Sequence, residues 1–189
     1  MIEGRLVRLR PFRRDDLPLL RAWHDNPEVM RYWGQASPLV LEDQFEVDLQ
    51  GRFARFDEAG YLAIVPLEPE DAGPIGRCEW EGLDRLNRSA EVMILIGEPA
   101  YWGHGFGTDA LVTLLRYLFE VQRLHRVGLS VLSWNERAIR SYEKAGFTVE
   151  GVLREDVYDA GRYHDQTVMS ILRHEFEAWW AAGAPTPPS

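Results

Sequence analysis

Hydrophobic and polar residues follow two periodicities along the chain, one typical of strands and one typical of helices. Residues 6–10 alternate apolar and basic side chains, which predicts a half-buried strand. Asp15 favours the start of a helix that follows, because acidic residues suit a first helical turn, and Leu17, Leu20 and Trp23 fall on one side of that helix. The chain therefore opens with a strand and an amphipathic helix.

The same reasoning predicts elements along the rest of the chain. A short helical piece after Pro27 ends near Gly34. Apolar residues at steps of four, four, four and three predict an amphipathic helix from Leu41 to Phe56. The further predicted elements are strands over 60–66, 74–81 and 88–96, a helix over 105–122, a strand over 127–131, a helix from Asn135 to Gly146, strands over 149–158 and 162–172, and a tail helix carrying Trp179 and Trp180.

The order of these elements is β-α-α-β-β-β-α-β-α-β-β. Helices interleave with strands, so the fold class is α/β (α+β) with a mixed sheet. The length of 189 residues predicts one domain, over residues 1–180, followed by a flexible tail over 181–189 that holds three of the prolines. Trp179 and Trp180 either cover the edge of the core or form a patch for a homodimer.

Composition and charge narrow the classes of function. Cys78 is the single cysteine, which excludes internal disulfides and thiolate zinc sites, and the five histidines show no ligand spacing, so we expect no metal. No apolar run approaches the ~18 residues that span a bilayer, and a cytoplasmic protein without membrane contact is expected. The net charge of −9 disfavours nucleic-acid binding and mildly favours a cationic partner or an amine, although it also serves solubility.

A glycine-rich loop stands directly before the most strongly periodic helix. It reads Trp102-Gly103-His104-Gly105-Phe106-Gly107-Thr108. Glycines let the backbone approach a ligand, and the free N–H groups of a helix start favour phosphate. The spacing departs from the dinucleotide fingerprint, and the only lysine, Lys144, excludes a nucleotide-triphosphate loop. The loop is thus a phosphate seat of another kind or an ordinary strand–turn–helix connection.

The strand before this loop carries a carboxylate. Residues 90–96 are apolar on both faces apart from Glu91, which shares a face with Met93 and Leu95. Glu91 is either paired with an arginine, for which Arg77 and Arg88 are candidates, or partly desolvated. Desolvation raises the pKa of a carboxyl group and suits it to act as a general base.

The helix from Asn135 offers two more candidates. Asn135 suits the N-cap, and Tyr142 lies on the apolar face together with Ala138 and Ile139. Tyr142 is either a core aromatic whose hydroxyl finds a partner or a proton donor to a departing thiolate.

Taken together, these segments resemble the GNAT superfamily of N-acetyltransferases over nearly the whole chain, and within it the branch that acetylates ribosomal-protein alanine N-termini. The resemblance rests on these segments: Arg8-Leu9-Arg10, Asp15-Asp16, Trp23, Asn26 to Val29, Glu91 to Ile96, Trp102 to Thr108, Asn135 to Phe147 and Asp165 to Leu172. It implies a GNAT-like, mostly antiparallel sheet flanked by helices, and acetyl-CoA as co-substrate.

The resemblance also implies roles for individual residues. The diphosphate of acetyl-CoA would bind the amides of 103–108, its pantetheine arm would bind the strand at Ile94 and Ile96, and Asn135 would contact the same arm. Tyr142 would protonate the sulfur and Glu91 would act as base. The candidate acceptor residues are Tyr32, Trp33, Trp80, Tyr158 and Asp165. The expected acceptor is a protein N-terminus. The alternatives are a small amine (aminoglycoside, polyamine or amino acid) and a non-catalytic acyl-CoA-binding module.

Overall fold

A computed structural model of the chain describes residues 1–33, 60–159 and 161–183. The predicted helix from Leu41 to Phe56 lies outside these residues. The elements are β1 (Ile2–Glu3), β2 (Val7–Pro11), η1 (Arg14–Asp16), α1 (Leu17–His24), α2 (Pro27–Met30), β3 (Gly60–Pro66), β4 (Gly76–Asp84), β5 (Ser89–Ile96), η2 (Pro99–Tyr101), α4 (Phe106–Arg116), η3 (Tyr117–Val121), β6 (Arg126–Leu132), α5 (Glu136–Lys144), β7 (Thr148–Asp159), β8 (Arg162–Leu172) and α6 (Arg173–Ala181).

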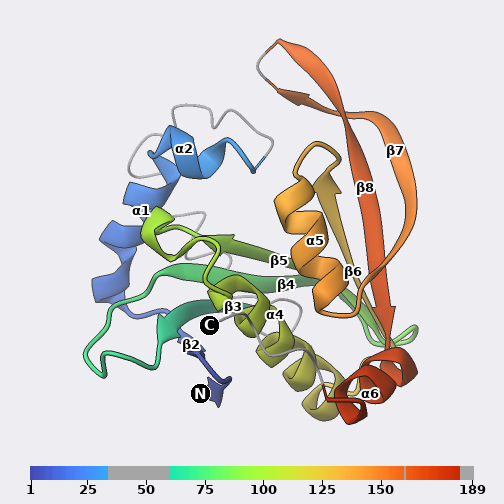
Figure 1. Cartoon of the computed structure of the whole chain (residues 1–189), viewed down its shortest axis with the longest axis horizontal. Coiled ribbons are helices and arrows are strands. Elements are labelled where there is room, and N and C mark those ends of the chain that lie inside the picture. Colours follow the sequence, from blue (N-terminus) through green and yellow to red (C-terminus); the bar gives the residue numbers. More distant parts are fainter. Residues whose placement is uncertain (34–59, 160, 184–189) are drawn as a thin grey trace.

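One sheet organises the described part of the chain. Its strand order is β1-β2-β3-β4-β5-β6-β8-β7, and β5 with β6 is the parallel pair among otherwise antiparallel neighbours. The expected mixed, mostly antiparallel sheet is confirmed. The β7–β8 hairpin projects beyond the other elements (Figure 1).

Helices cover both faces of the sheet because its strands alternate apolar side chains between the faces. On one face, Leu20 and Trp23 of α1 and Val29 of α2 pack with Tyr61 and Leu95 from the strands. The opposite face holds the larger core, where strand residues meet α4, η3 and α6. The site described below therefore lies in a sheet that is covered on both sides.

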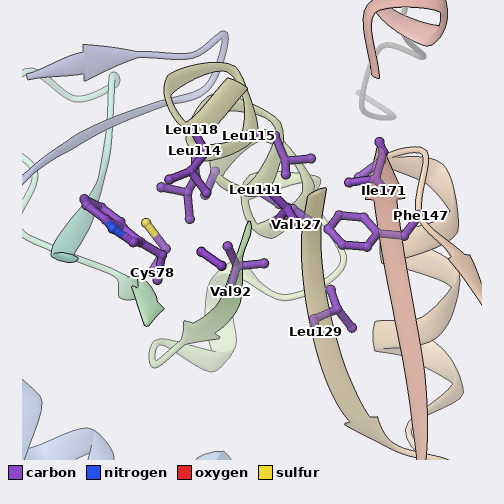
Figure 2. Packing of buried hydrophobic residues seen from close by; sticks show 14 of the residues in the cluster. Cys78, Val92, Leu111, Leu114, Leu115, Leu118, Val127, Leu129, Phe147 and Ile171 are labelled. Carbon is purple, nitrogen blue, oxygen red and sulfur yellow. The ribbon is translucent and has the colours of Figure 1, made fainter. Parts of the chain in front are cut away.

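The predicted leucine stripe of α4 forms the centre of the larger core. Leu111, Leu114, Leu115 and Leu118 are all buried. Figure 2 shows the first three directed at strand residues such as Val127. The helix is α-helical to Arg116 and continues as a wider π turn over η3, which no sequence periodicity indicated.

The tail helix α6 resolves the two possibilities for its tryptophans in part. Trp179 packs against the larger core, and Trp180 stacks on Phe176 while remaining 40% exposed. Arg116 places its guanidinium 6.0 Å from the Trp180 ring. No helix in the described ranges is long and apolar enough to cross a membrane.

Candidate active site

The two central strands of the sheet, β5 and β6, pair over only three residues and then separate. β5 pairs with β6 only from Ser89 to Glu91, opposite residues 126–128, and beyond this point the two strands separate. A cavity of about 700 Å³, the splay cavity, opens there. Its walls come from both strands, the glycine loop and α5, with Tyr32 and Trp33 at one side.

The free edge of β5 presents backbone groups to this cavity. The N–H of Gly97 donates to Ile75 O at 2.9 Å, so odd-numbered residues of β5 bond to β4. Ile94 and Ile96 consequently turn their N–H and C=O groups away from β4, toward the gap. The Trp102 indole Nε1 donates to Ile96 O at 2.8 Å, which ties the glycine loop to the end of the strand.

The glycine loop has the backbone conformation that a phosphate seat needs. Gly103 has φ +81° and Gly105 has φ +85°, a region that favours glycine. Gly105 is the N-cap of α4, and no side chain caps the helix. The first-turn amides of residues 106–108 therefore remain available to an anion. Because a diphosphate is such an anion, this loop fits coenzyme A.

Most of the predicted cofactor residues lie together on the splay cavity. The residues that line it are Ile94, Ile96, Trp102, Gly103, Gly105, Gly107, Thr108 and Asn135. His104 is not part of the lining, and neither is Phe106, whose ring packs 5.1 Å from that of Tyr101.

Helix α5 forms the opposite wall of the cavity. Asn135 is its N-cap, since its side chain accepts the Ala138 N–H at 3.2 Å, and Asn135 also lines the cavity. Tyr142 is half-buried in the same wall, and burial raises the pKa of Tyr142 to about 12. A hydrogen bond of 2.8 Å between the hydroxyls of Thr108 and Ser141 connects α5 to the start of α4.

Aromatic rings and arginines close one side of the splay cavity. The Arg137 guanidinium lies 4.8 Å from the Tyr32 ring and 4.5 Å from the Trp102 ring. The Tyr32 ring also lies 5.5 Å from that of Trp134. Sequence reasoning did not find Arg137 or Trp134, because the partners are far apart in the chain and no local pattern connects them.

A second cavity of about 1170 Å³, the acidic recess, lies beside the first and is lined by β4, β5 and β6. Its lining includes the carboxylates of Glu79, Glu81, Asp84 and Glu91. Glu81 stands directly opposite Glu91 in the β4–β5 ladder, so both side chains leave the same face. Among the described residues, Glu91 alone lines both cavities.

Glu91 is exposed and takes part in no ion pair within the described residues. Arg77, one of its candidate partners, pairs with Glu79 at 3.0 Å instead, and its guanidinium lies 4.4 Å from the Trp33 ring. Neither the arginine pairing nor the desolvation considered for Glu91 is found. Sequence reasoning also missed Glu79 and Glu81, although two acidic residues at the two-residue spacing of a strand face were visible in the sequence.

The remaining candidate acceptor residues are dispersed. Trp80 lines the acidic recess but is buried in the larger core, 5.5 Å from the Tyr117 ring. Tyr158 is exposed on the β7–β8 hairpin and packs 5.0 Å from Tyr163. Asp165 accepts the Glu155 N–H at 2.8 Å. Neither Tyr158 nor Asp165 lines either cavity.

Comparison with known proteins adds an independent finding. Residues 6–148 match the family model described as an acetyltransferase (GNAT) domain. The spermidine N(1)-acetyltransferase of Escherichia coli strain K12 is 33% identical over 176 residues, which cover 91% of this chain and 89% of that enzyme. The enzyme of the same name from Vibrio cholerae serotype O1 is 32% identical over 168 residues, covering 89% and 94%.

A solved structure is similar over the same extent. The spermidine N-acetyltransferase of Vibrio cholerae in complex with CoA and spermine superposes with a TM-score of 0.81 at 29% identity, covering 91% of this chain and 98% of that one. The comparisons do not single out the ribosomal-protein branch that the sequence suggested.

Proposed function

Because the chain belongs to the acetyltransferase (GNAT) family and is an N-acetyltransferase that uses acetyl-CoA, we propose that its acceptor is a small polycationic amine of the spermidine class. This is the alternative considered from the sequence, and it takes the place of a protein N-terminus as the main hypothesis. The relatives described above are spermidine acetyltransferases, which supports this choice.

The observation that carries the proposal is the carboxylate pair in the acidic recess. Glu81 and Glu91 face each other across neighbouring strands, and like charges in this position destabilise a sheet. A cation bound between them relieves the repulsion. Although Arg85 and Arg126 also line the recess, the facing pair favours a cationic ligand between the two carboxylates.

The distribution of charge in the recess favours several cationic centres over one. Asp84 accepts the Asn87 and Leu86 backbone N–H groups at 2.8 and 2.9 Å, and the bond from Asn87 holds the pKa of Asp84 below its ordinary value. Asp84 is thus a second anionic point beyond the Glu81–Glu91 pair. Within the described residues these carboxylates do not form a metal-binding group, whereas an extended polyamine meets separated charges one at a time.

On the donor side, acetyl-CoA supplies an acetyl group activated as a thioester. The amides at 106–108 would hold its diphosphate, and the outward backbone groups of Ile94 and Ile96 would bind its pantetheine arm. Asn135, fixed as the N-cap of α5, lies where it can contact the same arm. These residues hold one reactant in place, which replaces a bimolecular encounter.

On the acceptor side, Glu91 has the position that a general base needs, because it lines both cavities. It would take a proton from the incoming ammonium group, directly or through water, so that the neutral nitrogen can form the new N–C bond as the C–S bond breaks. Of the two protons that the nitrogen loses, one neutralises the sulfur and the other leaves to solvent.

The raised pKa of Tyr142 refines the role expected for it. Transfer of a proton from a phenol with a pKa of about 12 to a thiolate, whose thiol has a pKa of ~8.5, would cost about 5 kcal/mol. We therefore assign Tyr142 the donation of a hydrogen bond that stabilises negative charge as it develops on the sulfur. The phenol stays protonated throughout the physiological range.

The experiment that tests the proposal compares acceptors at saturating acetyl-CoA. Release of the coenzyme A thiol is followed with spermidine, an aminoglycoside and a peptide with an N-terminal alanine. We expect kcat/KM to be highest for spermidine and to fall in Glu81→Gln through a higher KM. A kcat/KM for the peptide that equals or exceeds that for spermidine would refute the proposed acceptor.

A further inference from the structure

Arg126 places a positive charge on the wall of the acidic recess. It is the first residue of β6, opposite Ser89 in the parallel ladder, and it lines the recess together with Glu91. An unpaired guanidinium there would repel a polycation and compete for Glu91. The chain does not leave it unpaired.

Glu150 of β7 neutralises this arginine. Its two carboxylate oxygens accept hydrogen bonds from Nη1 and Nη2 of Arg126, the first at 2.7 Å. Ser170 completes a closed network, since its hydroxyl accepts from Arg126 Nη1 at 2.7 Å and donates to Glu150 Oε1 at 2.8 Å. The two parallel N–H···O bonds fix the orientation of the guanidinium, and the carboxylate neutralises its charge.

The position of Glu150 in the strand is unusual. The β7–β8 ladder pairs Val149 with Met169 and Gly151 with Val168, which leaves Glu150 as the extra residue of a bulge. A bulge redirects a side chain relative to a regular strand. Here the redirected side chain reaches across β8 to β6. The hydrogen bond from Arg126, followed by that from Ser170, lowers the pKa of Glu150 to about 2, so the pair stays ionised at any working pH.

We propose that Glu150 determines the specificity of the enzyme for polycationic acceptors, although it lines neither cavity, because it holds and neutralises Arg126 at the edge of the acidic recess. The inference rests on the function proposed above and deepens it. Without Glu150, the charge of the recess becomes one unit more positive. The penalty is electrostatic, so it grows with the number of charges on the acceptor and is small for a monoamine.

The test uses Glu150→Gln, which keeps the size of the side chain and an acceptor oxygen but removes the charge. Apparent constants (KM or Ki) are measured for spermidine, 1,4-diaminobutane and butylamine at saturating acetyl-CoA. We expect the apparent KM or Ki to rise about fivefold for spermidine, less for the diamine and under about twofold for butylamine. Changes of this size are typical when one interaction between exposed charges is altered. The kcat at saturating spermidine should stay within about twofold of that of the wild type.

Two further variants separate this role from a merely structural one. In Arg126→Gln/Glu150→Gln, which removes both charges, the spermidine constant should return toward the wild-type value. Asp25→Asn is the matched control, because it breaks an exposed arginine pair with Arg21 that lies on neither cavity and should leave all three constants unchanged. Melting temperatures of all variants report any loss of folding.

The outcomes distinguish this inference from the proposed function. If the wild-type protein does not acetylate spermidine, the proposed function fails. If it does, but Glu150→Gln shifts the three constants equally, or the double variant stays as impaired as the single one, the specificity role of Glu150 is overturned and the proposed function stands.

Discussion

Replacing Tyr142 by phenylalanine tests the donor side of the mechanism. The change removes one hydroxyl from the wall of the splay cavity and keeps the ring, which lies 6.1 Å from that of Phe147. If the phenol donates a hydrogen bond that stabilises the charge on the departing sulfur, its removal lowers kcat about 100-fold or more. The KM for acetyl-CoA changes little, because the backbone contacts of residues 106–108 are untouched.

The raised pKa of Tyr142 predicts a second effect of the same substitution, on the pH dependence of the free energy of unfolding. The shift from the ordinary value of 10.0 to about 12 corresponds to about 2.7 kcal/mol. Above pH 10 the phenol ionises in the unfolded chain, whereas the folded protein keeps it protonated up to about pH 12. The unfolded state therefore binds fewer protons in this window, and the free energy of unfolding falls as the pH rises through it.

Both effects are measurable on the same pair of proteins. Urea denaturation at pH 9 and pH 11.5 should show that the wild type loses about 2 kcal/mol more stability than Tyr142→Phe, because other ionising groups are common to both. Thiol release gives kcat. A variant with wild-type kcat and the same alkaline loss as the wild type would show that the hydroxyl is neither buried nor used.

Three further outcomes follow from the geometry. Glu91→Gln should lower kcat with spermidine about 100-fold at pH 7. The deficit should shrink as the pH approaches the pKa of the amine, because more of the acceptor then arrives neutral. Unchanged thiol release at pH 7 would show that Glu91 takes no part in the chemistry. Gly105→Ala places an L side chain at φ +85°, which costs about 1–2 kcal/mol, so the melting temperature and the calorimetric affinity for acetyl-CoA should both fall; no change in either would contradict the role of the loop. Because the pKa of Glu150 is lowered from 4.5 to about 2, the stability from its pair with Arg126 is complete above pH 4.5 and is lost as the pH falls toward 2. Between these pH values the urea midpoint of Glu150→Gln should depend less on pH than that of the wild type. The same pH dependence in both proteins would contradict the pairing of Glu150 with Arg126.

Local patterns predicted the elements of this fold well. The strand over 60–66 is observed with the same bounds, Asn135 caps α5, and Gly146 has the left-handed φ of +93° expected after a helix. The glycine loop and the stripe of Leu111 were also visible in the sequence. Each of these features depends on residues a few positions apart, where backbone conformation and side-chain spacing are linked directly.

Where β-strands are concerned, the sequence was less informative. Strand β1 was not predicted, because a strand of two residues shows no periodicity. The bulge at Glu150 was not predicted either, because glutamate is not a residue type that marks a bulge. The candidate acceptor residues Tyr158 and Asp165 lie on the β7–β8 hairpin away from both cavities. Their spacing along the strand was known, but the direction in which that hairpin projects depends on its pairing with β6.

The sequence by itself determined the order of the longer strands and helices from β2 onward among the described residues, the loop that suits a diphosphate, and the candidate chemistry of Glu91 and Tyr142. Tertiary structure alone decided that β5 and β6 separate after Glu91, that Glu81 stands opposite it, and that Glu150 reaches Arg126. The physical reason is that register and separation of strands are set by contacts between distant segments. Periodicity reports only which face a residue occupies, and the residue across the ladder is decided when the whole sheet packs.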